Sequence, residues 1–327
     1  MRTQRIAPGA AVLGLLLLPV ACGDDGGSSG GETITLYTCV SDTTVEPVID
    51  AFEKANPGTE VDLFRAPTGE LNARVAGDVR SGGLRADVVW GCDPLTMQAY
   101  VDQGLVGGWT PGNVSEIPAR FRTADYVGAA VLYLVAVHGD DVEPPQEWSD
   151  LTGPDYADGV AVPDPAFAAS ALGAVGYFEA ESGYGLDFFA DLEQGGAVQV
   201  SSPDEVASGV AQGAYKAGIT IANSAYALQQ DGSPIGVVWP RPGAVAIYGP
   251  VALATDSEGL APAEDFITYL VSQEGQQLIG EVGSYPTLPG VPGPTRPEDA
   301  PVVYPDWPAI TAGQEDLLAE YQQIFGG

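Results

Sequence analysis

Strand-like and helix-like segments alternate over the first third of the folded part of this chain. A β-rich apolar run at 33–39 is followed by a segment at 45–55 whose apolar residues are spaced for one face of a helix. The pattern repeats twice, with strand-like runs at 60–66 and 86–92 and helix-like segments at 68–83 and 93–106. This alternation favours an α/β fold in which helices cover both faces of a parallel sheet.

Polar residues follow each strand-like run, at the point where the next helix is expected to begin. They are Ser41, Asp42 and Thr43 after the first run, Thr68 and Gly69 after the second, and Asp93 after the third. Such residues are good helix N-caps, so capping alone explains any one loop. Three such loops at the carboxyl edge of one sheet favour a ligand site, because helix N-termini there attract anionic or polar ligand atoms.

Two cysteines close the first and third strand-like runs. Right-handed crossovers make these two runs neighbours in a sheet of order 2-1-3, so Cys39 and Cys92 come within bonding range. In an oxidising compartment a disulfide is the default for such a pair. We therefore predict a Cys39–Cys92 disulfide beside the ligand site.

The first 31 residues have the pattern of an export signal and a linker. Two arginines precede a short apolar stretch, and Cys22 follows Val20 and Ala21 as in bacterial lipoprotein signals, although Pro19 stands where leucine is usual. The apolar stretch is too short to span a bilayer. We expect a signal peptide at 1–21, a lipid on Cys22 and a flexible tether at 22–31, which places the protein outside the cytoplasm on the cell membrane. A plain signal peptide with an unrelated cysteine is the alternative.

Composition excludes several classes of protein. The formal net charge is −32, and so acidic a surface repels nucleic acid. Only one histidine, His138, is present, which argues against histidine-based triads and zinc clusters. No glycine-rich phosphate loop and no nucleophile with a neighbouring base stands out, so we expect neither an enzyme nor a cofactor.

A second region begins near residue 126. Its continuously apolar run at 126–138 is typical of strands that cross between lobes. Further helices are expected near Ser170, at 223–226, at 261–283 and at 314–325, and an apolar return path at 235–254 contains Arg241.

Four segments together resemble bacterial extracellular solute-binding proteins of ABC importers, in the group with ferric-iron, phosphonate and sugar-phosphate binders. The segments are LYTCVSDTTVEPVIDAFEKANPG, RAPTGELNARV with ADVVWGCDP, WSDLTGPDYADGVAVPDP and AEDFITYLVSQEGQQLIGEVGSYPTLPGV. The resemblance implies a type II periplasmic-binding-protein fold, with two parallel-rich lobes flanked by helices and a ligand cleft between them. The lobes expected are 32–127 with 237–283, and 128–236 with 284–327.

This resemblance also implies a function and partners. A monomeric, lipid-anchored protein would capture a small solute and deliver it to an ABC permease and its ATPase. Ferric binders of the group use an adjacent tyrosine pair and often a histidine, whereas this chain has Ala225-Tyr226 and Ser41-Asp42 at those places. Because Fe³⁺ needs several anionic oxygens, we expect no metal and favour an organic phosphonate, phosphate or similar polar solute. A ferric binder with an altered ligand set and a non-transport surface lipoprotein are the alternatives.

The expected solute-binding residues come from both lobes. They are Ser41, Asp42, Thr43, Thr68, Gly69, Asp93, Ser170, Tyr226 and Arg241.

Overall fold

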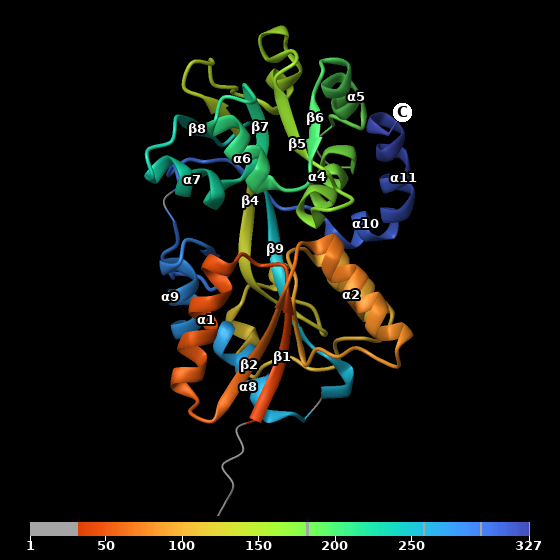
Figure 1. Ribbon diagram of the computed structural model, residues 1–327, viewed down its shortest axis with the longest axis vertical. Coiled ribbons are helices and arrows are strands. Elements are labelled where there is room, and N and C mark those ends of the chain that lie inside the picture. Colours follow the sequence, from red (N-terminus) through yellow and green to blue (C-terminus); the bar gives the residue numbers. More distant parts are fainter. Residues whose placement is uncertain (1–31, 181–182, 258, 295, 327) are drawn as a thin grey trace, which may run out of the picture. The chain divides into compact units, whose positions relative to one another are not determined.

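The strands pair into one continuous sheet that passes through both halves of the folded unit (Figure 1). The computed structural model describes residues 32–180, 183–257, 259–294 and 296–326. The predicted signal peptide, Cys22 and the tether lie outside these residues. Within them, no helix combines the length and apolar character needed to cross a membrane.

From β1 to α3 the strands and helices follow one another as the alternation predicted. The strands are β1 (Glu32–Thr38), β2 (Thr59–Arg65), β3 (Val88–Trp90), β4 (Val127–Gly139), β5 (Val160–Pro163), β6 (Val198–Val200), β7 (Ala217–Ile221), β8 (Ile235–Val238), β9 (Ala244–Leu253), β10 (Tyr285–Pro286) and β11 (Val302–Val303). The helices are α1 (Asp42–Ala55), α2 (Thr68–Arg80), α3 (Pro94–Asp102), α4 (Ala169–Ala180), α5 (Asp187–Gln194), α6 (Pro203–Ala211), α7 (Ala222–Gln230), α8 (Ala261–Leu270), α9 (Gln273–Glu281), α10 (Trp307–Ala312) and α11 (Gln314–Phe325). Short 3₁₀ helices lie at Val114–Glu116, Ala119–Phe121, Trp148–Thr152, Pro154–Tyr156 and Thr255–Ser257.

Strand order confirms the predicted 2-1-3 arrangement. The sheet runs β2-β1-β3-β9-β4-β7-β5-β6, and β1 pairs in parallel with both β2 and β3. At the other end β5 pairs in parallel with β6 and β7. Parallel ladders therefore lie at the two ends, and antiparallel pairs occupy the middle.

Two long strands connect the halves. β4 and β9 pair antiparallel from Val127 opposite Val251 to Leu134 opposite Val245, and every residue of β9 is buried. β3 pairs with one part of β9, while β7 and β8 pair with the far part of β4. In Figure 1 these two strands run between the group with α1, α2 and α8 and the group with α4, α6 and α7. The fold is thus α/β with two lobes, and the residue boundaries of the lobes stay a prediction.

One expected helix is interrupted. The amphipathic segment 261–283 forms α8 and α9 with a break at Val271 and Ser272. Ser272 caps the second helix, because its Oγ accepts a hydrogen bond from Gly275 N. A Cβ on Gly275 would lie 2.1 Å from Tyr269 O, so the missing side chain permits the tight turn between the helices.

Gln276 fixes this turn to the crossing strands. It is fully buried, and its Nε2 donates to Ala129 O at 2.7 Å and to Leu270 O at 2.8 Å. Its Oε1 accepts from the backbone N–H groups of Thr287 and Leu288. One side chain therefore satisfies four backbone groups from α8, β4 and the segment after β10.

Replacing Gln276 with methionine should lower the free energy of unfolding by at least about 3 kcal/mol, because an unpaired buried polar group costs about 1–3 kcal/mol. Urea denaturation measures the change. Gln277→Met, at the exposed neighbouring position, is the matched control and should change stability by less than about 0.5 kcal/mol. Equal losses for both variants would contradict this role of Gln276.

Candidate functional site

A cavity of about 250 Å³ lies between the two halves, at the carboxyl ends of β1, β3 and β7. Its lining includes Ala130 and Leu132 of β4 and Gly249 of β9. Its volume is near the lower end of small-molecule sites, which span about 300–1,000 Å³. The cavity is therefore suited to a small solute.

Five helices begin at this cavity. The lining residues at their N-termini are Ser41 and Thr44 for α1, Pro67 and Thr68 for α2, Ala168 and Ser170 for α4, Ser202 and Pro203 for α6, and Asn223 and Ser224 for α7. The N-cap residues of α1, α2 and α7 make no side-chain capping hydrogen bond. Because the first N–H groups of a helix have no intrahelical partner, these termini can donate to a guest molecule.

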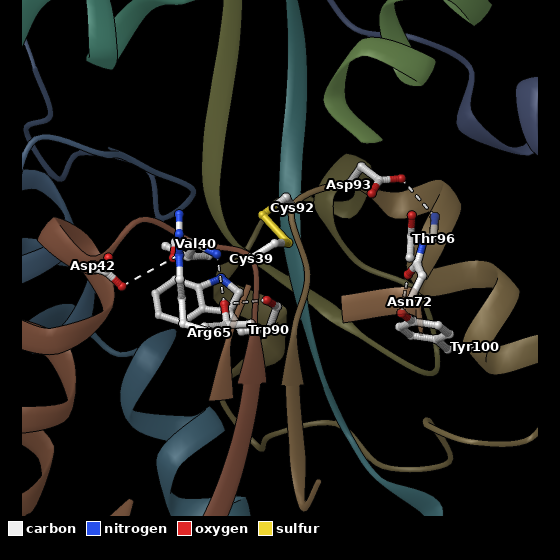
Figure 2. Close-up of a disulfide and its surroundings, with 11 residues drawn as sticks. Cys39, Val40, Asp42, Arg65, Asn72, Trp90, Cys92, Asp93, Thr96 and Tyr100 are labelled. Carbon is white, nitrogen blue, oxygen red and sulfur yellow. Dashed lines mark hydrogen bonds and ion pairs between the residues drawn. A yellow bond between two sulfur atoms is a disulfide. The ribbon is translucent and has the colours of Figure 1, made fainter. Parts of the chain in front are cut away.

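Arg65 is the one cation among the described residues that line the cavity. Its Nε donates to Val40 O at 3.1 Å and lies 3.6 Å from Asp42 Oδ1, as Figure 2 shows. These contacts fix the base of the guanidinium. Asp204 is the one carboxylate in the described lining, and its Oδ1 accepts a hydrogen bond from Ser224 Oγ.

Hydroxyl groups form a chain along one wall. Ser41 Oγ lies 3.1 Å from Thr43 Oγ1 and donates to Thr44 Oγ1 at 3.3 Å. Thr44 Oγ1 in turn lies 3.0 Å from Ser284 Oγ. Because a hydroxyl both donates and accepts hydrogen bonds, this row of hydroxyl groups can offer a solute either a donor or an acceptor.

A disulfide forms part of the same wall. It joins Cys39, after β1, to Cys92, after β3, with a Cα–Cα distance of 5.9 Å (Figure 2). Both cysteines line the cavity. The bond thus ties together two loops of the site.

Three of the residues expected from the sequence line the cavity, namely Ser41, Thr68 and Ser170. Asp42 and Thr43 are exposed in the first turn of α1, and Gly69 lies one residue beyond Thr68 in α2. The sequence reasoning did not single out Arg65, Asn223 or Ser284 as ligand residues. The sequence could have identified Arg65 as a ligand residue, because it is the last residue of a strand that ends at the carboxyl edge of the sheet, where the site was expected.

Asp93 is placed differently from the expectation. It is fully buried, and its Oδ1 accepts a hydrogen bond from Thr96 N at 2.8 Å, which caps α3 (Figure 2). Its Oδ2 has no hydrogen-bond partner. Burial away from water raises the pKa of this carboxyl. Asp93 is not among the residues that line the cavity.

Tyr226 and Arg241 also lie outside the described lining. Tyr226 OH accepts a hydrogen bond from Trp239 Nε1 at 2.9 Å. Arg241 is exposed and pairs with Glu147 at 3.1 Å, because backbone hydrogen bonds to Gln146 and Trp148 hold the two segments together. The cation of the cavity is therefore Arg65, where the sequence suggested Arg241. Among the described residues, no group of three or more His, Cys, Asp or Glu side chains could hold a metal ion.

The sequence model for bacterial extracellular solute-binding proteins matches residues 34–283. The chain belongs to this family. This solute-binding protein is 25% identical over 289 residues to an uncharacterized protein of Haemophilus influenzae, covering 82% of this chain and 81% of the relative. It is 27% identical over 164 residues to the spermidine/putrescine-binding periplasmic protein of Escherichia coli, covering 47% of this chain and 46% of that protein.

Solved structures share the fold of the solute-binding protein. The periplasmic binding protein AfuA of Actinobacillus pleuropneumoniae, with bound fructose-6-phosphate, superposes with a TM-score of 0.81 at 18% identity, covering 89% of this chain and 98% of AfuA. Iron-bound HitA of Pseudomonas aeruginosa gives a TM-score of 0.77 at 17% identity, covering 90% of this chain and 99% of HitA. Relatives with different ligands thus have the same two-lobed architecture.

The disulfide of the solute-binding protein should be detectable as a mass increase of the unalkylated protein on reduction. Replacing both Cys39 and Cys92 with alanine should lower the free energy of unfolding by about 2–4 kcal/mol, because the bond closes a long loop. Intact-mass spectrometry and urea denaturation provide the two measurements. Free thiols at both positions in the protein purified without reductant would contradict the bond.

Asp93→Asn should change how stability depends on pH. The folded-state pKa of Asp93 is raised above the unfolded value of about 3.9, so the stability it contributes is present below that pH and is lost as pH rises through the folded pKa. Asparagine keeps the cap but cannot ionise. The unfolding free energy of the variant minus that of the wild type should therefore increase from pH 4 upward and then level off. A difference that is constant in urea titrations between pH 4 and 8 would contradict this.

Proposed function

We propose that this protein captures a small organic phosphonate or phosphate, or a similar small polar anion, and delivers it to the permease of an ABC importer. Family membership supports solute binding and disfavours the alternative of a non-transport surface lipoprotein. The solute would bind in the cavity between the lobes and be enclosed when the lobes move together about β4 and β9.

The convergence of helix N-termini on one cavity carries this proposal. Each N-terminus has about half a positive elementary charge and several N–H groups without intrahelical partners. Three of the five make no side-chain cap bond, and Arg65 adds a planar guanidinium, which can donate two parallel hydrogen bonds to two oxygens of a phosphoryl group. An anionic head group can therefore replace the hydrogen bonds that it loses on leaving water.

The charge of the lining disfavours a polyamine or ferric iron. A polyamine needs several carboxylates, but Asp204 is the one described carboxylate in the lining and accepts a bond from Ser224. For ferric iron, the anionic oxygen ligands among the expected solute-binding residues would be Asp42, Asp93 and Tyr226. Asp93 caps α3, Tyr226 accepts from Trp239, and neither is among the described residues that line the cavity, which argues against this set.

The membrane attachment is part of the same proposal. A lipid on Cys22, followed by the glycine- and serine-rich stretch to residue 31, would hold the monomeric binding unit close to the permease and its ATPase. A tethered module meets a membrane partner at an effective concentration set by the tether.

Organic phosphonates and phosphates should raise the melting temperature of the protein. The stabilisation at a hundredfold excess over the dissociation constant is about 2.7 kcal/mol. A thermal-shift screen over phosphonates, sugar phosphates, inorganic oxyanions, polyamines and Fe³⁺ measures it. Stabilisation by spermidine or Fe³⁺ but by none of the phosphorus compounds would overturn the proposal.

Arg65→Ala should weaken binding of the best phosphorus compound by about tenfold to a hundredfold, because hydrogen bonds to charged groups contribute about 1.5–3 kcal/mol. Isothermal titration calorimetry measures the dissociation constant. Arg241→Ala is the matched control, since it removes an exposed guanidinium outside the cavity lining, and it should leave the affinity unchanged. Equal affinities for Arg65→Ala and the wild type would remove Arg65 from the site.

A further inference from the structure

The floor of the cavity is one face of the crossing strands. Ala130 and Leu132 alternate along β4, and Gly249 of β9 lies opposite Ala130. Ile221 of β7 lies opposite Leu134, the next residue on the same face of β4. Alternate residues of a strand share a face, and so do residues directly opposite each other in an antiparallel pair. All of these residues except Leu134 line the cavity, so its floor is apolar.

Two side chains of this floor are accessible. Leu132 and Ile221 are partly exposed, although the residues next to them in β4 and β7 are buried. Both line the cavity, which accounts for their exposure. Covering these side chains with an apolar part of a solute is favourable, because it removes apolar surface from water.

Phe167 adds a further apolar surface. It lies between β5 and α4, lines the cavity and is 53% exposed. Its segment has a defined conformation, because Asp164 O accepts hydrogen bonds from Phe167 N and Ala168 N. A solute in the cavity can therefore contact an aromatic ring as well as the aliphatic floor.

The polar groups of the cavity come from other segments. Arg65 is the last residue of β2, and the N-termini of α1 and α2 follow β1 and β2. The row of hydroxyl groups that includes Ser41 and Thr44 ends at Ser284, after α9. Small-molecule sites commonly combine apolar side chains with a few polar groups that fix the orientation of the ligand. An inorganic oxyanion can use the polar groups alone, whereas a larger solute can use both kinds of surface.

We propose that the solute is an amphiphilic phosphonate or phosphate, whose phosphoryl group carries an uncharged apolar substituent of a few carbon atoms. This inference rests on the proposed function and narrows the class of solute. The phosphoryl oxygens accept hydrogen bonds from the helix N-termini and Arg65, and the substituent covers Leu132, Ile221 and Phe167. Inorganic phosphate leaves these apolar side chains in water. A sugar phosphate loses hydrogen bonds to water wherever its hydroxyl groups face the floor.

Two ligands of nearly equal size test the apolar part of the site. Propylphosphonate and 2-hydroxyethylphosphonate have the same number of non-hydrogen atoms, and they differ in a terminal methyl or hydroxyl group. Isothermal titration calorimetry should give propylphosphonate a dissociation constant lower by about tenfold, because the methyl group gains from burial and the hydroxyl group loses hydrogen bonds to water. Affinity should also rise by about threefold to fourfold per methylene from methylphosphonate to propylphosphonate.

Two variants test whether the named side chains cause this preference. Leu132→Asn keeps a side chain of similar size but places an amide on the floor, and Phe167→Ala removes an exposed ring. Each should reduce the preference for propylphosphonate by about threefold or more. Leu278→Asn is the matched control, because Leu278 is also a partly exposed leucine but is not among the described residues that line the cavity. It should keep the wild-type preference, and circular dichroism melts identify any variant that fails to fold.

The preference of the wild-type protein decides the outcome without any variant. Equal affinities, or tighter binding of 2-hydroxyethylphosphonate or inorganic phosphate, overturn the inference and leave the proposed function in place. Failure of every phosphorus compound to bind overturns both. A preference for propylphosphonate that persists unchanged in Leu132→Asn and Phe167→Ala also contradicts the inference, because the substituent then lies elsewhere. A preference that falls in these two variants and not in Leu278→Asn supports it.

Discussion

The antiparallel pair of β4 and β9 is the contact on which the rest of the structure depends. Both strands continue beyond their shared ladder, β9 toward β3 and β4 toward β7 and β8. Each lobe therefore completes its sheet with strands that also belong to the other lobe. The cavity follows from this arrangement, because the carboxyl ends of β1, β3 and β7 all point to the crossing region, and the helices after β1 and β7 begin there.

A strongly acidic protein can still offer an anion a favourable site. The formal net charge is −32, but exposed charges are screened over about 8–10 Å at physiological salt. Helix N-termini attract an anion only within about the first turn, where the bound solute is in direct contact and little water screens the charge. Under the proposed function, the helix N-termini and Arg65 would therefore outweigh the acidic exterior for an anion inside the cavity, while that exterior would slow the approach of anions.

The sequence predicted the architecture better than the site. The 2-1-3 strand order and the polar residues at the sheet edge could be predicted from the sequence. They depend on the spacing of apolar residues within each strand or helix and on the right-handed connection between successive parallel strands. The role of Ser284 could not be predicted, because its hydroxyl contacts that of Thr44, which lies 240 residues away in the sequence. Ser41 and Asp93 looked equivalent, since each stands directly before a helix. Only the packing shows that Asp93 turns inward to cap α3 while Ser41 lines the cavity.

The disulfide has a consequence for when the binding site is completed. Cytosolic thiols keep such bonds reduced, whereas extracytoplasmic compartments allow them to form. In a chain whose cysteines are still reduced, the loops after β1 and β3 are therefore separate, whereas the disulfide joins them. In the proposed function, the cavity would gain this wall only after export, which would couple formation of the site to arrival in the compartment that contains the solute.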